Sequence, residues 1–281
     1  MVNFNGELLA DDSNYLNHEN RGLRYGDSLF ETMRVVDGRV IFWEDHYFRL
    51  MSSMRIVRMS IPMEFTMEFL LAEILKTIAA SDFVSLPARV RLTVFRNNGG
   101  FYLPDTNTVS FCIECTPLAS SFYVMDDQPY EIELFKDFHV NHDLTSTLKT
   151  SNRIINVVGS IFAKENGYQN CLLLNQTKNV VEALNGNIFM VVGNTVTTPS
   201  LKDGCLNGMI RKRLVEIITK LDSYTFIEAS ISPFDLQKAD ELFITNTIMG
   251  IRPITKYRKK EYGKKVALDL IGKLNALARL N

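Results

Sequence analysis

Lys149 is the residue whose chemistry the sequence puts forward first. It stands in NHDLTSTLKTSNRIINVV, residues 141–158, among small hydroxyl residues and just before an apolar run typical of the start of a helix. No acidic residue follows it closely, so it has no obvious local ion-pair partner. Such a lysine is either a solvated loop residue or an amine held for covalent catalysis. The rest of the chain has to decide between the two.

Three further features offer groups that would suit a single ligand. Glu182 is a lone carboxylate in the apolar stretch NVVEALNGNIF, where a charged side chain is costly unless it is paired. The stretch NGMIR, residues 207–211, places a glycine before a predicted helix, whose free N–H groups would bind an anion such as phosphate. Arg49, in HYFRL, lies on a predicted helix whose apolar face would turn it inward.

An amine, a buried carboxylate, a helix N-terminus and an arginine together match pyridoxal 5′-phosphate. The amine would bind the cofactor covalently, the carboxylate would keep the pyridine nitrogen protonated, and the helix end and the arginine would take the phosphate. Each feature alone also has an ordinary interpretation. Arg49 is then a surface arginine, Glu182 an edge-strand residue and NGMIR a plain helix cap. The residues by themselves leave both interpretations open.

The elements that would position these groups belong to a chain of ordinary composition. Its 281 residues suffice for about two domains, and 46% apolar with 22% charged residues is typical of a soluble globular protein. The net charge of −1 gives no reason to expect a nucleic-acid partner. With no signal peptide and no long apolar run, we expect a cytoplasmic protein without a membrane span.

Metal chemistry is not expected. Cys112 and Cys115 form a C-x-x-C in TVSFCIEC, but this stretch alternates like a strand and would point the two thiols to opposite faces. His139 and His142 lie near Lys149 without an acidic residue to complete a metal site. We therefore expect reduced thiols and no bound metal.

The predicted elements fall into two domains joined by a linker. In the first, residues 1–118, the Asn5-Gly6 and Asp37-Gly38 pairs predict two hairpin turns, and two helices and two further strands complete the unit. Residues 119–130 are small and polar and contain proline, which is typical of a linker.

The second domain, residues 131–281, begins with a strand that precedes Lys149. A helix with Ser151 as its N-cap and Gly167 as its stop is expected next. Three successive strand segments, a helix and two more strands follow, and a closing amphipathic helix is expected at 264–279. Two such domains leave a cleft between them, where cofactor sites often lie.

The chain resembles the aminotransferase class IV family, the pyridoxal-phosphate enzymes of fold type IV, over nearly its whole length. Five segments carry the resemblance in order: RGLRYGDSLFETMRVVDG, HYFRL, LKTSNR, VVEALNGNIFMVVGNTVTTPSLKDGCLNGMIR and ELFITNTIMGIRPI. The resemblance implies a two-domain α/β (α+β) fold with the cofactor in the cleft between the domains. A protein that kept this fold and only binds the cofactor is the alternative, although Lys149 and Glu182 are both present.

The resemblance also implies roles for individual residues. Lys149 would carry the cofactor and, once freed by the substrate amine, take a proton from the substrate. Glu182 would pair with the pyridine nitrogen. The phosphate would be bound by Arg49, the backbone amides of Met209 and Ile210, and Thr247.

Two positions depart from the transaminases of the family. Transaminases with Ile-Thr at the Met209-Ile210 position have a hydroxyl contact that this chain lacks. Branched-chain transaminases carry a tyrosine near the cofactor's phenolic oxygen where this chain has Ile154. That contact must come from elsewhere or be absent.

Three activities share this scaffold: branched-chain L-amino-acid transamination, D-amino-acid transamination, and lysis of 4-amino-4-deoxychorismate to 4-aminobenzoate and pyruvate. Thr32 in FETMR, the LKTSNR pattern and the FRNNGGFY loop favour the lyase, although D-amino-acid transaminases share part of LKTSNR. Phe101 stands where the lyase loop has an arginine, which weakens the case for a substrate with two carboxylates. Arg96 is the predicted carboxylate anchor, unless it is a strand-end surface arginine. The lyase is the preferred prediction, and the two aminotransferases are the alternatives.

The implied partners are a small amino substrate with a carboxylate and a second copy of the chain. Members of the family are usually homodimers, in which a loop of one subunit covers the site of the other. Tyr25, in RYGDSLF, is a candidate for lining the substrate side of the cofactor together with Thr32, or else a core tyrosine.

Overall fold

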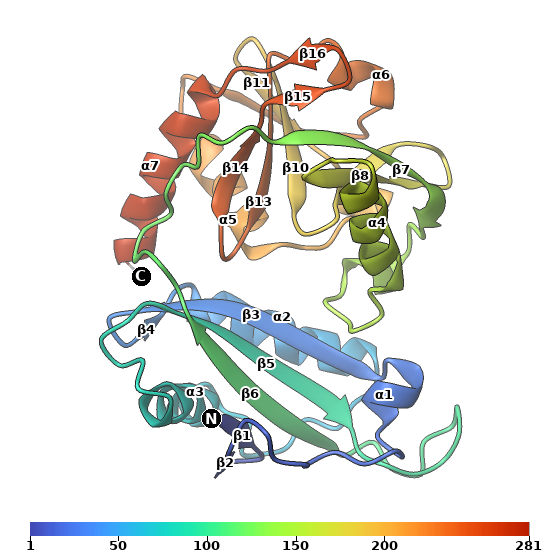
Figure 1. The fold of residues 1–281 in the computed structure, drawn as a ribbon, viewed down its shortest axis with the longest axis vertical. Coiled ribbons are helices and arrows are strands. Elements are labelled where there is room, and N and C mark those ends of the chain that lie inside the picture. Colours follow the sequence, from blue (N-terminus) through green and yellow to red (C-terminus); the bar gives the residue numbers. More distant parts are fainter. Residues whose placement is uncertain (281) are drawn as a thin grey trace. The chain divides into compact units, whose positions relative to one another are not determined.

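The structure, a computed structural model, describes residues 1–280. The chain divides into two compact units, which Figure 1 shows in sequence colours. The first comprises Met1–Ser121 together with Lys149–Asn152, and the second comprises Phe122–Leu148 and the chain from Arg153 onward. The main crossing at 121–122 falls within the predicted linker. The short return of Lys149–Asn152 to the first unit is a feature that the sequence did not predict.

A six-stranded antiparallel sheet forms the first unit, in the order β2-β1-β6-β5-β3-β4. Its strands are β1 (Val2–Phe4), β2 (Glu7–Leu9), β3 (Ser28–Val36), β4 (Arg39–Val40), β5 (Ala88–Arg96) and β6 (Val109–Pro117). Both predicted hairpins are present. Asn5 and Gly6 turn β1 into β2, and Asp37 and Gly38 turn β3 into β4, all four with positive φ as such tight turns require.

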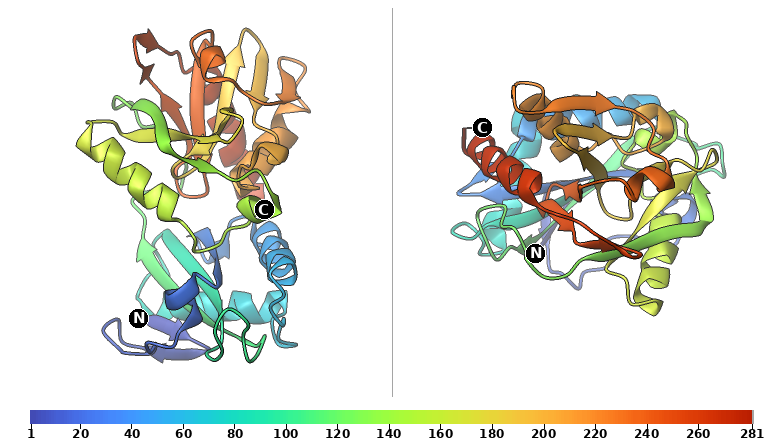
Figure 2. Two further views of the ribbon diagram at one scale, coloured as in Figure 1. Left: turned by 90° about the vertical axis from the view of Figure 1, so that its right-hand side faces the viewer. Right: turned by 90° about the horizontal axis from the view of Figure 1, so that it is seen from above.

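Two helices cover one face of this sheet. The helices of the unit are α1 (Arg21–Tyr25), α2 (Trp43–Ile56) and α3 (Met67–Ala80), and Figure 2 shows α2 and α3 on the same side of the strands. Val90, Leu92 and Val94 of β5 are fully buried in the core that packs against these helices. Because side chains alternate along a strand, Arg89, Arg91 and their cross-strand neighbours lie on the opposite side, which we call the open face.

The C-x-x-C cysteines confirm this alternation. The Cys112 thiol lies 3.5 Å from the Tyr15 hydroxyl, whereas the Cys115 thiol lies 3.8 Å from the carbonyl oxygen of Thr77 in α3. The two sulfur atoms therefore point to opposite faces of β6, as predicted.

The second unit contains two five-stranded sheets, in the orders β12-β11-β10-β13-β14 and β16-β15-β7-β8-β9. The strands are β7 (Glu131–Val140), β8 (Asn170–Asn175), β9 (Val180–Ala183), β10 (Asn187–Val192), β11 (Thr195–Thr198), β12 (Thr225–Glu228), β13 (Glu241–Asn246), β14 (Gly250–Ile254), β15 (Lys256–Tyr257) and β16 (Lys260–Glu261). The helices are α4 (Ile154–Glu165), α5 (Met209–Ile218), α6 (Pro233–Leu236) and α7 (Lys265–Leu280), with 3₁₀ turns at η1 (Leu144–Thr147) and η2 (Leu201–Asp203).

The core of this unit lies between its two sheets. Leu134 and Leu172 of one sheet and Ile188 and Ile244 of the other belong to a single buried apolar cluster. Helix α4 packs on β7 and β8, while α5 and α7 pack on each other and on β13. The unit is therefore a four-layer arrangement in which helices cover the outer faces of both sheets. Together the two units form the mixed α/β fold that was predicted.

The start of α4 corrects one prediction. The helix begins at Ile154, its N-cap position is Arg153, and no side chain caps it. Ser151, the predicted N-cap, instead donates its backbone N–H to the carbonyl of Ser28 at 3.0 Å. The prediction was wrong because Ser151 is used in pairing with a strand distant in sequence, and a local cap signal cannot reveal that pairing.

Candidate active site

The Lys149 segment, residues 149–152, pairs with the backbone of β3. Phe30 donates its backbone N–H to the Lys149 carbonyl at 2.9 Å, and Leu29 and Thr150 form an antiparallel bridge. Lys149 therefore lies opposite Phe30, and its side chain is on the open face. Its Nζ atom is 4.4 Å from the centre of the Phe30 ring, which is cation–π distance.

Thr32 and Arg91 lie beside this lysine on the same face. Thr32 is two residues after Phe30 in β3 and is directly paired with Arg91 of β5. The Arg91 Cζ atom is 3.8 Å from the centre of the Phe30 ring, so Arg91 and Lys149 contact the same ring. Burial lowers the pKa of Arg91, the nearby charge of Glu114 opposes that shift, and the charge of Arg89 adds to it.

The other face of β3 carries a buried charge cluster. Glu31 accepts hydrogen bonds from both Nε and Nη2 of Arg49, with the Nε contact at 2.7 Å. His46 Nδ1 lies 2.7 Å from the second oxygen of the same carboxylate. Arg49 and Glu31 side chains are 9% and 2% exposed. Such a two-point pairing fixes the orientation of the planar Arg49 guanidinium.

The protonation states in this cluster follow from burial and charge. Burial alone would raise the pKa of Glu31, but the charge of Arg49 and hydrogen bonds from His46 and Arg49 lower it to about 2. Burial lowers the pKa of His46, contact with Glu31 opposes that shift, and the charges of Arg49 and Lys149 add to it. A neutral His46 must then donate its Nδ1–H, because an ionised carboxylate only accepts.

Glu31 and His46 were not singled out from the sequence. The signal for Glu31 was present, because a single carboxylate in the apolar strand SLFETMRVV needs a buried partner. The same argument holds for Glu182. His46 precedes Arg49 by three residues, so both face one side of α2.

Arg96 is held by structural contacts. Its Nε donates to Asp27 at 2.9 Å, and Nη1 and Nη2 donate to the carbonyls of Arg58 and Val57 at 3.1 and 2.8 Å. Nη1 also donates to Asn107 at 2.5 Å. A guanidinium has five N–H groups, so these bonds leave little capacity for a substrate. The role of Arg96 as a substrate anchor stays a prediction, which this geometry does not favour.

Tyr25 lies at the edge of a cavity in the first unit. The cavity has a volume of about 330 Å³ and is also lined by Arg21, Arg96, Tyr102 and Thr150. The Tyr25 and Tyr102 rings are 5.6 Å apart. Tyr25 is half-buried and borders a space next to the Lys149 segment, so its substrate-lining role stays a prediction.

Glu182 is the buried carboxylate of the second unit. It lies in β9, as predicted, with its residue 6% exposed. One of its oxygens accepts the backbone N–H of Leu206 at 2.9 Å. Leu206 precedes α5 by only three residues, so this bond connects Glu182 to the segment that leads into the predicted phosphate-binding helix end.

The N-terminus of α5 has the features expected of an anion site. Gly208 is its N-cap, no side chain caps the helix, and the helix begins at Met209. Asn187 donates to the Leu206 carbonyl at 2.8 Å, and a Cβ atom added at Gly208 would lie 2.1 Å from the Asn187 side-chain oxygen. Asn187 thus fixes the backbone just before the helix, and only glycine fits at the cap.

Thr247 lies in the turn between β13 and β14. Asn246 shapes this turn by accepting the N–H groups of Ile248 and Met249 at 3.0 and 2.8 Å. In β13 itself, Thr245 pairs with Asn187 of β10, and its buried hydroxyl forms no hydrogen bond within residues 1–280. Thr245 is a polar group near α5 that the sequence did not single out.

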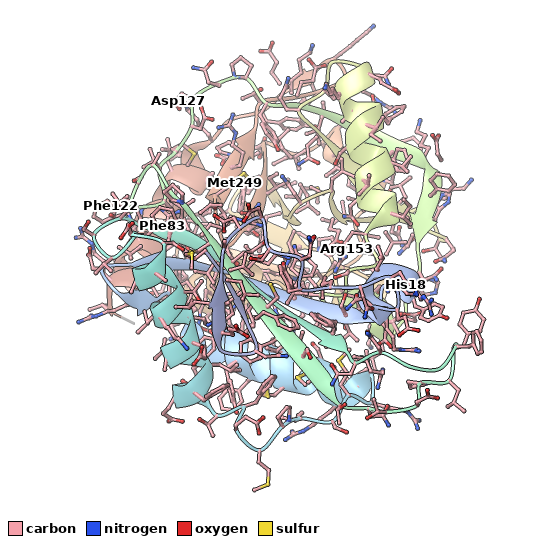
Figure 3. All side chains as sticks on the ribbon, turned by 60° about the horizontal axis from the view of Figure 1, so that its bottom comes forward. His18, Phe83, Phe122, Asp127, Arg153 and Met249 are labelled. Atoms are coloured by element: carbon pink, nitrogen blue, oxygen red, sulfur yellow. The ribbon has the colours of Figure 1, made fainter. Side chains whose placement is uncertain are left out.

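The second unit holds the chain firmly on both sides of the lysine segment. Asn207 donates its N–H to the Thr147 carbonyl at 3.3 Å, and Arg153 donates to the Leu148 carbonyl at 2.8 Å. Arg153, labelled in Figure 3, marks the point where the chain re-enters the second unit. The position of Lys149 along the chain is therefore fixed from both ends.

Residues 28–257, which cover most of the chain, match the family described as amino-transferase class IV. The chain belongs to the aminotransferase class IV family. Enzymes of this family depend on pyridoxal 5′-phosphate, and this chain is such an enzyme.

Individual relatives cover the chain nearly from end to end. A D-alanine aminotransferase of Staphylococcus epidermidis is 24% identical over 264 residues, which are 91% of this chain and 88% of the relative. The crystal structure of a branched-chain aminotransferase of Thermoproteus uzoniensis superposes with a TM-score of 0.87 at 23% identity, covering 99% and 94% of the two chains. A 4-amino-4-deoxychorismate lyase of Pseudomonas aeruginosa gives 0.82 at 24% identity, covering 98% of both. Both structures have the predicted fold.

Each unit of this class IV chain, taken separately, offers groups of the kinds that the cofactor needs. The groups are an amine on a fixed backbone, an arginine oriented by Glu31, a buried carboxylate, an uncapped helix N-terminus and the unsatisfied hydroxyl of Thr245. Their individual roles stay predictions. In the described part of the chain no group of three or more His, Cys, Asp and Glu side chains is arranged to hold a metal, and no helix there is long and apolar enough to span a membrane.

Proposed function

We propose that this class IV enzyme is a lyase that converts 4-amino-4-deoxychorismate to 4-aminobenzoate and pyruvate. The observation that carries the proposal is the position of Thr32. It lies on the open face beside Phe30, whose ring Lys149 contacts, and directly opposite Arg91. The threonine that favours the lyase in the sequence thus faces the same side of β3 as the ring that the predicted catalytic amine contacts.

The reaction needs a base, an acid and no second substrate. When bound, the cofactor withdraws electrons from the carbon that carries the substrate amine. Lys149 removes the proton from that carbon, as a positioned amine can at a rate advantage of about 10²–10⁴-fold. The bond between the ring and the ether oxygen of the enolpyruvyl group then breaks, and the oxygen leaves with the electron pair. Thr32 donates a hydrogen bond to that oxygen, and the ring becomes aromatic. The departing enolate takes up one proton at its CH2 carbon, which balances the proton that Lys149 removed, and becomes pyruvate.

Arg91 binds a substrate carboxylate in this proposal. Its guanidinium and the Lys149 amine contact the same Phe30 ring, at 3.8 and 4.4 Å from the ring centre. The distance between Arg91 Cζ and Lys149 Nζ therefore cannot exceed the sum of these two distances. A substrate held at Lys149 through its amine has its carboxylate within reach of Arg91, and a charge-assisted hydrogen bond is stronger than a neutral one.

The cofactor contacts are proposed as the sequence predicted them. Lys149 forms the covalent link, Glu182 pairs with the pyridine nitrogen, and Arg49 binds the phosphate. The Met209 and Ile210 amides and Thr247 complete the phosphate site. Glu31 is added as the group that orients Arg49, because it holds the guanidinium at two points. The proposed homodimer rests on the resemblance alone.

Aminotransferase activity is the second candidate. It is favoured by the similarity to a D-alanine aminotransferase, which extends over 91% of this chain, and by the superposition on a branched-chain aminotransferase. In addition, Phe101 is 81% exposed and supplies no cation to the loop. In this case Lys149 would move the proton that it removed from the substrate, and one water molecule would supply the oxygen of the keto acid product, while the amino group would stay with the cofactor.

The experiment that separates the two candidates follows the cofactor absorbance of the purified holoenzyme. Stoichiometric conversion to the aminated cofactor by L-glutamate, L-leucine, L-isoleucine or D-alanine, with no keto acid present, would establish an aminotransferase. We expect no conversion, and instead equal amounts of pyruvate and 4-aminobenzoate from 4-amino-4-deoxychorismate. Absence of both products would refute the lyase.

Lys149→Ala is the control for the attachment site. The backbone carbonyl that pairs with Phe30 is retained in this variant, so the fold should persist while turnover and covalent attachment are lost. The measurements are far-ultraviolet circular dichroism, cofactor retention after borohydride reduction, and pyruvate release. Activity like that of the wild type would exclude Lys149 as the catalytic amine.

A further inference from the structure

The open face of the first unit has an excess of positive charge. Along β3, β5 and β6, the described side chains on this face include Arg34, Arg89 and Arg91, and Glu114 is the one acidic side chain among them. Glu114 lies 4.0 Å from Arg91 and is half exposed. One carboxylate cannot neutralise three guanidinium groups, so this face has a net positive charge before Lys149 is counted.

Arg89 is the arginine of this face that has no counter-ion among the described residues of the unit. It is half-buried in the middle of β5, and its side chain forms no hydrogen bond or ion pair with any other residue of 1–280. Arg34, its partner on β3, donates to the Ser120 carbonyl and is only 4% exposed. A half-buried arginine beside two others raises the electrostatic energy of the folded chain unless an anion lies nearby.

The position of Arg89 relative to the catalytic amine defines what that anion would be. Arg91 and Lys149 share the Phe30 ring. Arg89 precedes Arg91 by two residues in β5 and lies on the same face, so the backbones of the two residues are about 7 Å apart along the strand. The cationic groups therefore continue from Lys149 through Arg91 to Arg89. A ligand that follows this line carries an amine and then two separate acidic groups.

We propose that Arg89 determines substrate specificity by binding a second carboxylate of the substrate, in addition to the one that Arg91 binds. The inference rests on the proposed function, because it takes the substrate to be an amine bound at Lys149. In this proposal Arg89, in β5, makes the carboxylate contact that the arginine of the lyase loop would make, because this chain has Phe101 at that loop position. The substrate class is an amine with two carboxylates separated by roughly the spacing of two residues on a strand.

The test uses non-reacting probes, so it does not depend on which reaction the enzyme performs. Benzoate, benzene-1,3-dicarboxylate and benzene-1,4-dicarboxylate are titrated into the cofactor-loaded full chain, and binding is measured by calorimetry. We expect at least one dicarboxylate to bind about 10–100-fold more tightly than benzoate, the range for one charged hydrogen-bonding contact. Arg89→Gln should lose this advantage and keep the affinity for benzoate, and Arg89→Lys should restore part of it.

A matched control and a kinetic measurement complete the experiment. Arg55→Gln removes an exposed arginine from α2, outside the open face, and should leave all three affinities unchanged. With 4-amino-4-deoxychorismate, Arg89→Gln should raise KM by about 10–100-fold with a much smaller change in kcat. Equal affinity of the wild type for all three probes, or an advantage that survives in a folded Arg89→Gln variant, would overturn the proposal. Failure of the lyase reaction alone would leave the probe result intact.

Discussion

At the scale of single residues, β3 separates two kinds of chemistry by alternation alone. Phe30 and Thr32 face the open side with Lys149, while Glu31 faces α2 and orients Arg49. Neighbouring residues thus serve the amine and the predicted phosphate arginine from opposite faces of one strand. A shift of the strand by one residue would exchange these roles, so the register of β3 is essential to the site.

The Glu31 cluster predicts a specific dependence of stability on pH. The pKa of Glu31 is lowered from its ordinary value of 4.5 to about 2. A lowered carboxyl pKa stabilises the fold above pH 4.5, and this contribution is lost as the pH falls towards 2. The loss should amount to about 3 kcal/mol. Urea unfolding of the wild type at pH 6, 4, 3 and 2 should show it.

Glu31→Gln is the variant that isolates this effect. It should be less stable at pH 7 by about 3–5 kcal/mol, because Arg49 then keeps a buried charge without its partner. Its stability should fall less steeply than that of the wild type between pH 4.5 and 2. Parallel pH profiles for the two proteins would show that the titrating group is elsewhere. The cofactor should also bind more weakly, because the two-point contact of the Glu31 carboxylate with Arg49 is then lost.

At the scale of elements, the local sequence predicted the turns, strands and helix starts that depend only on residues close together in the chain. The Asn5-Gly6 and Asp37-Gly38 turns have the positive φ angles that their residue types favour. Glu182 lies in a strand and Met209 opens a helix, as expected. What failed was the cap at Ser151, because its N–H bonds to Ser28, more than a hundred residues earlier.

The same limit explains the residues of the site that sequence reasoning missed. Arg91 reaches Phe30 through the pairing of β3 with β5, and Arg96 is enclosed by carbonyl groups at the end of α2. Neither neighbourhood is encoded in the residues next to these arginines. The sequence pointed to Arg96, whose N–H groups are largely used by Asp27, Asn107 and backbone carbonyls, and it did not point to Arg91.

The entry to α5 gives a prediction at this scale. In Gly208→Ala, the added carbon would meet the Asn187 oxygen at 2.1 Å, so either the Asn187 side chain, which bonds to the Leu206 carbonyl, or the backbone before the helix must move. We expect a loss of about 1–3 kcal/mol in stability and weaker cofactor retention. Gly272→Ala is the matched control, since nothing lies within 4 Å of its added carbon in α7. It should stabilise the protein by about 0.5–1 kcal/mol. Similar thermal stability and cofactor retention in both variants would contradict this account.

At the scale of the whole molecule, the main feature is the position of the predicted catalytic lysine along the chain. It lies in a short segment of the first unit that is flanked on both sides by chain of the second unit. Leu148 and Arg153 belong to the second unit, and the four residues between them belong to the first. The chain thus contributes its amine to β3 by a backbone pairing of two hydrogen bonds.

Ser151→Pro tests whether this pairing places the lysine. Proline removes the N–H that bonds to Ser28, while Ser151→Ala keeps it. We expect Ser151→Pro to lower kcat by about 10²-fold, as small displacements of a catalytic group do, with the cofactor still attached. Ser151→Ala should behave like the wild type in the same pyruvate assay. Equal kcat values in the two variants would show that the edge pairing is not needed.

The four-residue return also limits how this protein can be recombined with its relatives. A chimera joined at residues 121–122 would combine one parent's sheet with the other parent's lysine segment, because that segment lies later in the chain but pairs with Ser28–Phe30. Compatibility would therefore depend on a match between the edge of β3 and a foreign strand of four residues. Exchange of activities between members of the family is then easiest when β3 and the lysine segment are transferred together.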